Sequence, residues 1–282
     1  METDKIEFIP EGTVTSPEGF YAGAAYSGIK KAKDSLDLGI LFSEAPCVTA
    51  GLFTATKLRA AAVTLSQERL KDGKAVALVV NSGCANAYTG KQGLADAEKM
   101  AAIAANGIGV SAKDVLVAST GVTGKLLPME KIEQGISRLI LSHDGGHELA
   151  RAIMTTDTAP KETALAVSSG GGNFTIGGIA KGSGMIHPNM ATMFCFLTTD
   201  AAVELGFLRT ALQKSVAMSL NMISVDGDTS PSDTVLLMAN GMAKNEVIKA
   251  GTRNAEIFQQ ALDRICIYFA KLLARDGEGA TR

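Results

Sequence analysis

Short runs of almost uninterrupted apolar residues are the feature that most limits how this chain can fold. They are CVTAGLFT (47–54), AVALVV (75–80), DVLVAS (114–119), TALAV (163–167), FTIGGIA (174–180), MFCFLTT (193–199) and TVLLMA (234–239). A strand with one face in water alternates apolar and polar residues, whereas a strand covered on both faces is apolar throughout. The runs therefore predict strands in sheets that are covered on both faces.

Segments with the periodicity of an amphipathic helix lie between the apolar runs. They cover residues 92–107, 128–140, 204–220 and 254–274. We expect Gly107 to close the first helix, Pro128 to lie in the first turn of the second, and Asn254 to cap the last. The sequence SSGGGN (168–173) predicts a hairpin turn. Strands and helices do not alternate strictly, so the sequence predicts a layered α/β fold with mixed or antiparallel sheets.

Length and composition narrow the class of protein. The chain has 282 residues, of which 46% are hydrophobic, so it can fill the core of one large domain or of two smaller ones. Its formal net charge of -2 does not favour nucleic acid or an anionic membrane as a partner. The first residues form no apolar signal region, and no apolar stretch reaches the roughly 18 residues of a membrane helix. We therefore expect a cytoplasmic protein.

The cysteines do not indicate a metal site. Cys47, Cys84, Cys195 and Cys266 are widely spaced and form no CxxC pair, which is typical of a protein from a reducing compartment. Cys84 follows a predicted strand, where a nucleophile paired with a histidine could stand. The sequence favours the simpler interpretation of a buried structural cysteine.

Two polar loops resemble ligand-binding motifs without fitting them. GGIAKGSG (177–184) lacks the GxxxxGK[ST] spacing and leads into a strand, so no helix N-terminus is available for a phosphate. Asp226, Asp228 and Asp233 include the D-x-D spacing of a calcium loop, but the remaining ligands of an EF-hand are absent. We expect turn capping by these aspartates, and we predict neither a metal nor a cofactor.

Thr192, in GMIHPNMATMF (184–194), allows two interpretations. It can be the first residue of a strand. It can also be a nucleophile if the bond after Ala191 breaks, because a new N-terminal amine with a pKa of about 8 can act as the base for its own hydroxyl. Pro188 restricts the backbone upstream, and Gly182 and Gly184 permit unusual dihedral angles. These residues alone favour the strand.

The stretch ASTGVTG (118–124) offers a complement to such a nucleophile. A predicted strand ends at Ser119, and Thr120 and Gly121 follow. The unhindered Gly121 amide and the Thr120 hydroxyl are two donors that could stabilise an oxyanion. A simple junction between a strand and a turn explains the same residues, and the sequence chemistry alone favours it.

Several motifs occur together in one order along the whole chain. They are GFYAGAAYSGIK (19–30), NSGCANAYTG (81–90), STGVTG (119–124), IMTTDT (153–158), KGSGMIHPNMATM (181–193), SVDGDTSPSDTV (224–235) and DGEGATR (276–282). In this combination the chain resembles the glutamate N-acetyltransferase / ornithine acetyltransferase family of arginine biosynthesis. The resemblance implies self-cleavage between Ala191 and Thr192, which gives an α-chain region of residues 1–191 and a β-chain region of residues 192–282.

The resemblance also implies the reaction and its residues. Thr192 would take acetyl from N2-acetyl-L-ornithine, hold it as an ester and pass it to L-glutamate in a ping-pong mechanism. Thr120 and Gly121 match the family's oxyanion hole. The positions that match its substrate-binding residues are Thr158, Lys181, Thr192 and Glu278. Lys181 can pair with the substrate α-carboxylate, and Glu278 with an ornithine amino group.

The same resemblance implies a layered α/β/β/α sandwich with mixed sheets, of the kind shared by ornithine acetyltransferases and self-processing aminopeptidases. It implies αβ units that assemble as a heterotetramer. Acetyl-CoA stays open as a further acetyl donor, because no motif for it is readable.

The chain departs from the family pattern in two places. Cys84 stands where the family usually has asparagine, which weakens the idea of a cysteine nucleophile. Family chains continue beyond DGEGAT, so we expect the β-chain region to be incomplete at its C-terminus, with Glu278 less firmly held. Two alternatives therefore remain: a related self-processing amidase or aminopeptidase with water as the acceptor, and an inactive fragment that needs a further segment.

Overall fold

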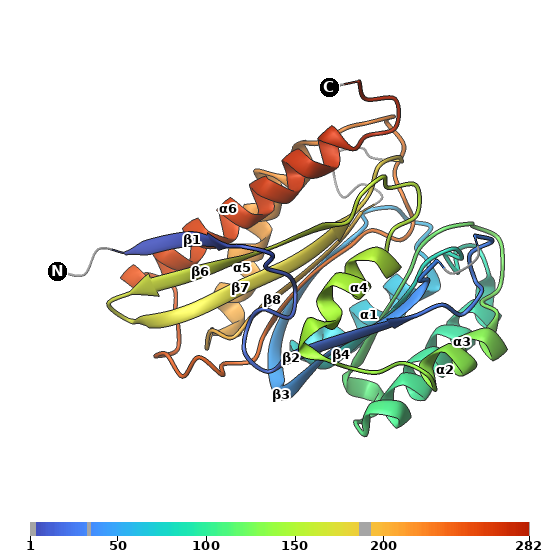
Figure 1. The fold of residues 1–282 in the computed structure, drawn as a ribbon, viewed down its shortest axis with the longest axis horizontal. Coiled ribbons are helices and arrows are strands. Elements are labelled where there is room, and N and C mark those ends of the chain that lie inside the picture. The colour runs from blue at the N-terminus through green and yellow to red at the C-terminus, as the bar shows by residue number, and fades with distance from the viewer. Residues whose placement is uncertain (1–3, 33–34, 186–192, 282) are drawn as a thin grey trace.

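The computed structural model (Figure 1) describes residues 4–32, 35–185 and 193–281. The strands are β1 (Lys5–Ile9), β2 (Phe20–Ala25), β3 (Leu38–Phe53), β4 (Lys74–Asn81), β5 (Val115–Ser119), β6 (Lys161–Ser169), β7 (Gly172–Lys181), β8 (Phe194–Thr199) and β9 (Thr234–Ala239). The α-helices are α1 (Ala61–Arg69), α2 (Gly90–Ile108), α3 (Met129–Ile136), α4 (Gly146–Ala152), α5 (Leu205–Ala217) and α6 (Arg253–Arg275). Short 3-10 helices span Leu70–Asp72, Ala112–Asp114, His143–Gly145 and Leu220–Met222.

One hydrogen-bonded sheet runs through this part of the chain in the order β1-β6-β7-β8-β9-β3-β4-β5, and β2 also pairs with β3. The pairs β4–β5 and β8–β9 are parallel, and the other pairs are antiparallel. The prediction of a mixed sheet is confirmed, as is the hairpin that joins β6 to β7 around Ser169 and Gly172.

The strand β3 joins two halves of this sheet. Its first residues pair with β2 and β4, whereas Val48 to Phe53 pair with β9. Between these parts the pairing with β4 changes register between Phe42 and Cys47, an irregularity that bends a strand. The half-sheet β1-β6-β7-β8-β9 and the half-sheet β2-β3-β4-β5 consequently pack face to face across an inner core.

The alternation of side chains along the strands separates this inner core from two outer ones. In β8, Phe194 and Phe196 belong to the inner core, whereas Cys195 and Leu197 face α5 and α6. The strands β4 and β5 alternate in the same way between the inner core and a third core under α1, α2 and α3. Strands covered on both faces are apolar throughout, and the expected α/β/β/α sandwich is confirmed.

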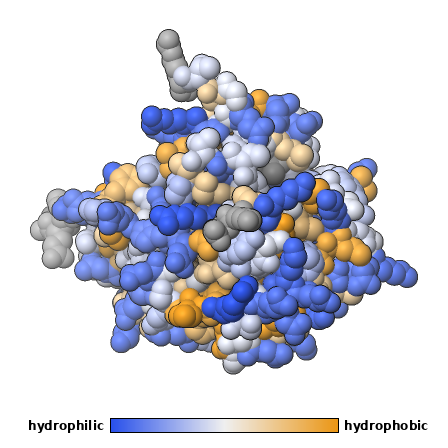
Figure 2. All heavy atoms as spheres, turned by 45° about the vertical axis from the view of Figure 1, so that its right-hand side comes forward, coloured by the Kyte–Doolittle hydropathy of each residue, from blue (hydrophilic) through white to orange (hydrophobic). Residues whose placement is uncertain are grey.

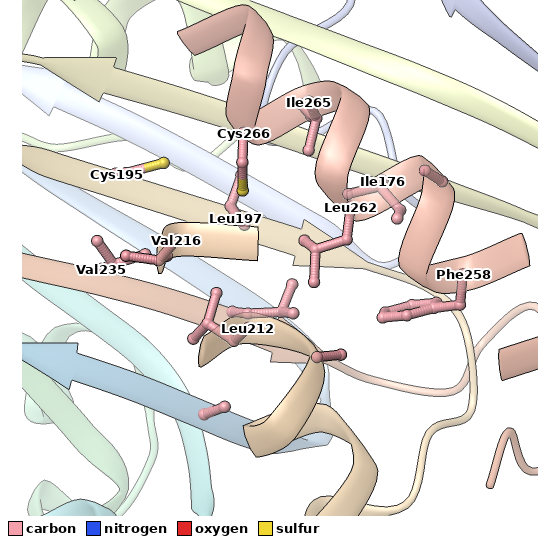
Figure 3. Close-up of a cluster of buried hydrophobic side chains, with 14 of the residues drawn as sticks. Ile176, Cys195, Leu197, Leu212, Val216, Val235, Phe258, Leu262, Ile265 and Cys266 are labelled. Carbon is pink, nitrogen blue, oxygen red and sulfur yellow. The ribbon is translucent and has the colours of Figure 1, made fainter. Parts of the chain in front are cut away.

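The outer core beside α5 and α6 is built mainly from apolar side chains (Figure 3). Side chains from both helices meet those of β7, β8 and β9: Ile176, Cys195, Leu197, Leu212, Val216, Val235, Phe258, Leu262, Ile265 and Cys266. Each large aliphatic or aromatic side chain buried in this way contributes about 1.5–3 kcal/mol. This packing fixes α6, whose C-terminal end leads to Glu278 at the wall of the cavity described below.

The surface seen in Figure 2 is mainly hydrophilic, and its hydrophobic residues form small scattered patches. Such single exposures are normal for a folded protein. Across the described ranges, no helix combines the length and the apolar character needed to cross a membrane.

Several helix ends differ from the prediction. Gly109, in the left-handed region with φ +74°, closes α2 in place of Gly107, because either glycine fits the motif and only the backbone angle decides. Thr252 rather than Asn254 caps α6, since its side chain accepts a hydrogen bond from Ala255 N. The helix α3 ends at Ile136, four residues before the expected end. The elements β1, β2, α1 and α4 were not predicted.

Candidate active site

A large cavity opens where the two half-sheets end on the same side. Its volume is about 1460 Å³. The walls are the loops that follow β4, β5 and α4, the end of β7, the loop before β9 and the segment after α6. Of the residues predicted for the site, Thr120, Gly121, Lys181 and Glu278 line this cavity. Loops at one end of a sheet sandwich carry ligand sites more often than its core.

Thr120 and Gly121 follow β5 in a loop that is locked to the loop after β4. Thr120 N donates to Asn81 O at 3.0 Å, and Val122 N donates to Gly83 O at 3.3 Å. Gly121 has a φ of +123°, and a Cβ there would lie 2.5 Å from the Gly83 carbonyl carbon. Only glycine suits both the backbone angle and the close approach.

This loop presents two donors to the cavity. Within the described ranges the Gly121 N–H has no acceptor, and the residue is exposed. The Thr120 hydroxyl oxygen accepts a hydrogen bond from Lys181 Nζ at 3.4 Å, so its own proton is free to point elsewhere. An amide and a hydroxyl side by side are the donors of an oxyanion hole.

Lys181 is the last residue of β7, and its side chain is almost fully buried, at 2% exposed. Its ammonium also lies over the Phe194 ring, 5.9 Å from the centroid. Burial lowers the pKa of Lys181, against the opposing effect of Asp157 and Asp233. In the described part of the chain, no carboxylate contacts the Lys181 ammonium. Burying a cation in this way is costly, and the arrangement suits a site that receives an anionic ligand.

Asp157 and Lys161 form a separate ionic network beside Lys181. Asp157 Oδ1 accepts from Lys161 Nζ at 2.8 Å and from Gly182 N at 2.7 Å. Burial raises the pKa of Asp157, but Lys181 and Lys161 outweigh it and hold that pKa below the usual value. Lys161 Nζ also reaches Asp276 Oδ2 at 2.5 Å, which ties the end of α6 to β6.

Thr158, predicted to bind substrate, joins this network instead of lining the described cavity wall. Its backbone N donates to Asp276 Oδ2 at 3.1 Å, and its hydroxyl donates to Asp276 Oδ1. Its role toward a substrate remains a prediction.

Glu278 is well held. Its backbone N donates to Ser183 O at 2.7 Å. A Cβ on Gly184 would lie 2.8 Å from Glu278 Oε1, so the carboxylate rests against the Gly184 backbone at the cavity wall. The segment after α6 is thereby fixed to the end of β7, and this acidic group is available to a cationic ligand.

Ala191 and Thr192, the predicted cleavage site, lie outside the described residues, as does His187. The chain directly after them is anchored. Met193 N donates to Asp233 Oδ1 at 3.1 Å, and Thr234 N donates to Met193 O at 3.2 Å.

Asp233 is a functional candidate that the sequence reasoning missed. Its side chain is fully buried, and its Oδ2 has no partner of full hydrogen-bond geometry in the described part of the chain, although the nearby Ser230 side chain lowers its pKa. Burial raises the pKa of Asp233 well above its usual value, while the Met193 N–H and Lys181 oppose the rise. One signal could have identified Asp233. It lies one residue before β9, and β9 pairs in parallel with β8, so Asp233 lies beside the start of β8.

Asp226 behaves as expected. It accepts hydrogen bonds from Asp228 N, at 3.1 Å, and from Met185 N, which is the turn capping predicted for it.

Cys84 is a structural residue. Its thiol donates to Lys125 O at 3.4 Å and lies 5% exposed. Burial raises the pKa of the Cys84 thiol, the opposite of what a reactive cysteine needs.

The fold is similar to that of a solved aminopeptidase. An L-aminopeptidase D-Ala-esterase/amidase from Ochrobactrum anthropi, described as a variant of the Ntn hydrolase fold, aligns with a TM-score of 0.55 at 11% identity, over 95% of this chain and 86% of its own. At that identity the likeness shows the fold alone.

The family follows from closer matches. Residues 21–282 match the profile of the ArgJ family, and the chain belongs to this family. It is 52% identical to the arginine biosynthesis bifunctional protein ArgJ of Dehalococcoides mccartyi, over 98% of this chain and 69% of that protein.

Two solved structures agree. ArgJ from Bacillus halodurans is 43% identical with a TM-score of 0.64, and the match covers 67% of this chain and all of that one. The ornithine acetyltransferase of Mycobacterium tuberculosis, solved in complex with ornithine, is 36% identical with a TM-score of 0.60, over 65% of this chain and 98% of its own.

Proposed function

We propose that this protein transfers acetyl from N2-acetyl-L-ornithine to L-glutamate in arginine biosynthesis, through an acetyl ester on Thr192. The observation that carries the proposal is the group of donors in the cavity: the Gly121 N–H and the Thr120 hydroxyl, held beside the buried Lys181 ammonium. Membership of the ArgJ family and the likeness to a protein solved as an ornithine acetyltransferase with ornithine support it.

The nucleophile is made by self-cleavage. The Thr192 hydroxyl oxygen attacks the Ala191 carbonyl carbon, the bond to the Thr192 nitrogen breaks, and water hydrolyses the resulting ester. The freed Thr192 amine then acts as base for its own hydroxyl. The hydrogen bond from Met193 N to Asp233 supports this assignment, because it fixes the chain next to the nucleophile.

Acetyl transfer then takes two balanced steps. The Thr192 oxygen attacks the acetyl carbonyl, Thr120 and Gly121 stabilise the oxyanion, and the departing ornithine nitrogen takes the proton that left the hydroxyl. The glutamate amine next attacks the ester, and the Thr192 oxygen recovers a proton as N-acetylglutamate leaves. Lys181 pairs with the α-carboxylate of each substrate, and Glu278 with the side-chain ammonium of ornithine.

The α-chain and β-chain pieces stay together after cleavage and form the αβ unit of a heterotetramer. The sheet supports this part of the proposal, because β8 of the later piece pairs with β7 of the earlier one, and β9 pairs with β3. Acetyl-CoA is proposed only as a second acetyl donor, to be tested by acetylation of the protein without acetylornithine.

Denaturing mass spectrometry tests self-cleavage. The purified protein should give two fragments with a junction at Ala191 and Thr192, and Thr192→Ala should stay whole. A wild-type chain that stays whole would contradict the proposal. Acetyl transfer to glutamate is then compared with release of free acetate, because a hydrolytic amidase of the same fold would give acetate alone.

A further inference from the structure

Lys30 is a second cation withdrawn from solvent at the cavity wall. Other basic residues line the same wall but are exposed: Lys31, Lys125, Lys131 and Arg151. Lys30 is half-buried, and burial lowers its pKa, against the opposing effect of Asp37. A partly desolvated ammonium facing a cavity is better suited to bind an anion than a lysine in free water.

The backbone from Ser27 to Lys30 is held by hydrogen bonds. The fully buried Asp37 carboxylate accepts hydrogen bonds from Ser27 N at 2.7 Å, Ile29 N at 2.6 Å and Lys30 N at 3.0 Å. The Lys30 ammonium itself donates to Leu36 O at 2.8 Å. One donor of three is thus used for position, and the ammonium is preorganised.

Lys30 also packs against the loop after β4, which in turn contacts the loop that carries Thr120 and Gly121. A Cβ on Gly83 would lie 3.1 Å from Lys30 Cγ, and a Cβ on Gly121 would lie 2.5 Å from the Gly83 carbonyl carbon. Gly83 is therefore packed between Lys30 and Gly121.

Lys30 also shares its electrostatic surroundings with Lys181. Asp157 and Lys181 both act on the Lys30 ammonium. The two carboxylates that raise the pKa of Lys30 are Asp37 and Asp157. Both have other partners, because Asp37 accepts hydrogen bonds from backbone N–H groups and Asp157 forms an ion pair with Lys161. Two buried or half-buried ammonium groups at one cavity repel each other, and an anion that lies between or beside them offsets this repulsion.

The two substrates of the proposed reaction differ at the end of their side chains. Both carry an α-carboxylate, but ornithine ends in an ammonium and glutamate ends in a second carboxylate. A site that accepts them in turn needs one anionic and one additional cationic group. Glu278 supplies the first. We propose that Lys30 supplies the second and binds the side-chain carboxylate of the acceptor glutamate. This inference rests on the proposed function.

The test separates the two half-reactions. Wild type and Lys30→Met are loaded with acetyl from N2-acetyl-L-ornithine, the acetylated protein is followed by intact mass, and the acetyl group is then chased with glutamate or with glutamine, its neutral analogue. Lys30→Met should load at the wild-type rate. Its KM for glutamate should rise about 10- to 100-fold, the equivalent of one lost hydrogen bond between charged groups.

Specificity gives the decisive readout. The preference for glutamate over glutamine should collapse in Lys30→Met and be partly restored in Lys30→Arg, which a mere loss of structure would not produce. Lys113→Met, an exposed lysine outside the cavity, serves as the charge-matched control.

An unchanged preference in Lys30→Met would overturn the role of Lys30 and leave the proposed reaction standing. Equal loss of loading and chase in Lys30→Met would also overturn it. Failure of the wild type to load acetyl would instead overturn the proposed function itself.

Discussion

Two buried lysines stand on neighbouring strands at the same end of the sheet, in opposite electrostatic situations. Lys161 begins β6, Lys181 ends β7, and Lys161 pairs in register with Ala180. Both are nearly inaccessible, at 3% and 2% exposed. The Lys161 ammonium contacts two carboxylates, whereas the Lys181 ammonium contacts a threonine hydroxyl and the face of a phenylalanine.

The difference separates a structural charge from one that we propose to bind a ligand. The network of Lys161, Asp157 and Asp276 is internally paired and ties the end of α6 to β6. Among the residues that the structure describes, no carboxylate contacts the Lys181 ammonium, and the nearby Asp233 has a buried oxygen without a described partner. A folded protein tolerates such unpaired charge where a substrate supplies the missing partner.

Replacing Lys161 should have the largest effect on stability. Lys161→Met leaves the buried Asp157 carboxylate without its ion pair, and breaking a buried pair in this way costs about 3–5 kcal/mol. Urea unfolding at neutral pH measures the loss. A loss below about 1 kcal/mol, the scale of a surface pair, would show that the two lysines do not differ as described.

Replacing Lys181 should have the converse effect. Lys181→Met should reduce acetyl transfer by about 10²–10³-fold, as removal of one preorganised donor does, with no loss of stability at neutral pH. The native state holds Lys181 with a lowered pKa, so the unfolded state binds more protons between that lowered pKa and 10.5, and stability rises with pH across that window. The variant should lack this rise, as measured by urea unfolding at several pH values. A clear loss of stability would contradict this assignment.

Asp233 should give the opposite pH dependence. Its native pKa lies well above its ordinary value of 3.8, so the native state binds more protons than the unfolded state between those two values. The contribution of Asp233 to stability is therefore present at low pH and is lost as pH rises through this window.

Asp233→Asn should flatten that fall in stability, with Asp144→Asn, an exposed position, as the control. Urea unfolding across the pH range measures it. Superimposable pH profiles for wild type and Asp233→Asn would show that Asp233 is not held protonated.

The smallest change in stability is expected at Glu278. It lies two residues after Asp276, which belongs to the ionic network with Lys161. Asp276→Asn weakens the contact to Lys161 and should cost about 1–3 kcal/mol. Glu278→Gln, at an exposed side chain, should stay within about 0.5 kcal/mol of wild type but raise the KM for acetylornithine. Equal stability losses in the two variants would place Glu278 in the network as well.

Much of the fold could be predicted because its signals are local. The apolar runs gave β4, β5 and β9 almost to the residue, since each strand is buried on both faces. β1 lacked that signal because it is largely exposed at a sheet edge. β2 is rich in alanine and glycine, which have low strand propensity, and only its pairing with β3 makes it a strand.

The site residues also fall into those that the sequence predicted and those that it did not. Thr120, Gly121, Lys181 and Glu278 could be named from motifs, and the structure brings all four to one cavity. Asp233 had been interpreted as a turn-capping residue, and Lys30 had been given no role of its own. Neither residue type nor spacing distinguishes those roles, because burial and neighbouring charges decide them.

The sequence by itself determined the layering, most of the buried strands and the longer helices, and the family, because periodicity and motifs are properties of short stretches. The tertiary structure alone decided which lysine is paired and which is not. That outcome depends on residues far apart in the chain, such as Lys30, Thr120, Lys181, Asp233 and Glu278, which approach one another only when the two half-sheets pack. The protonation and binding properties of these groups follow from that approach and from the water it excludes.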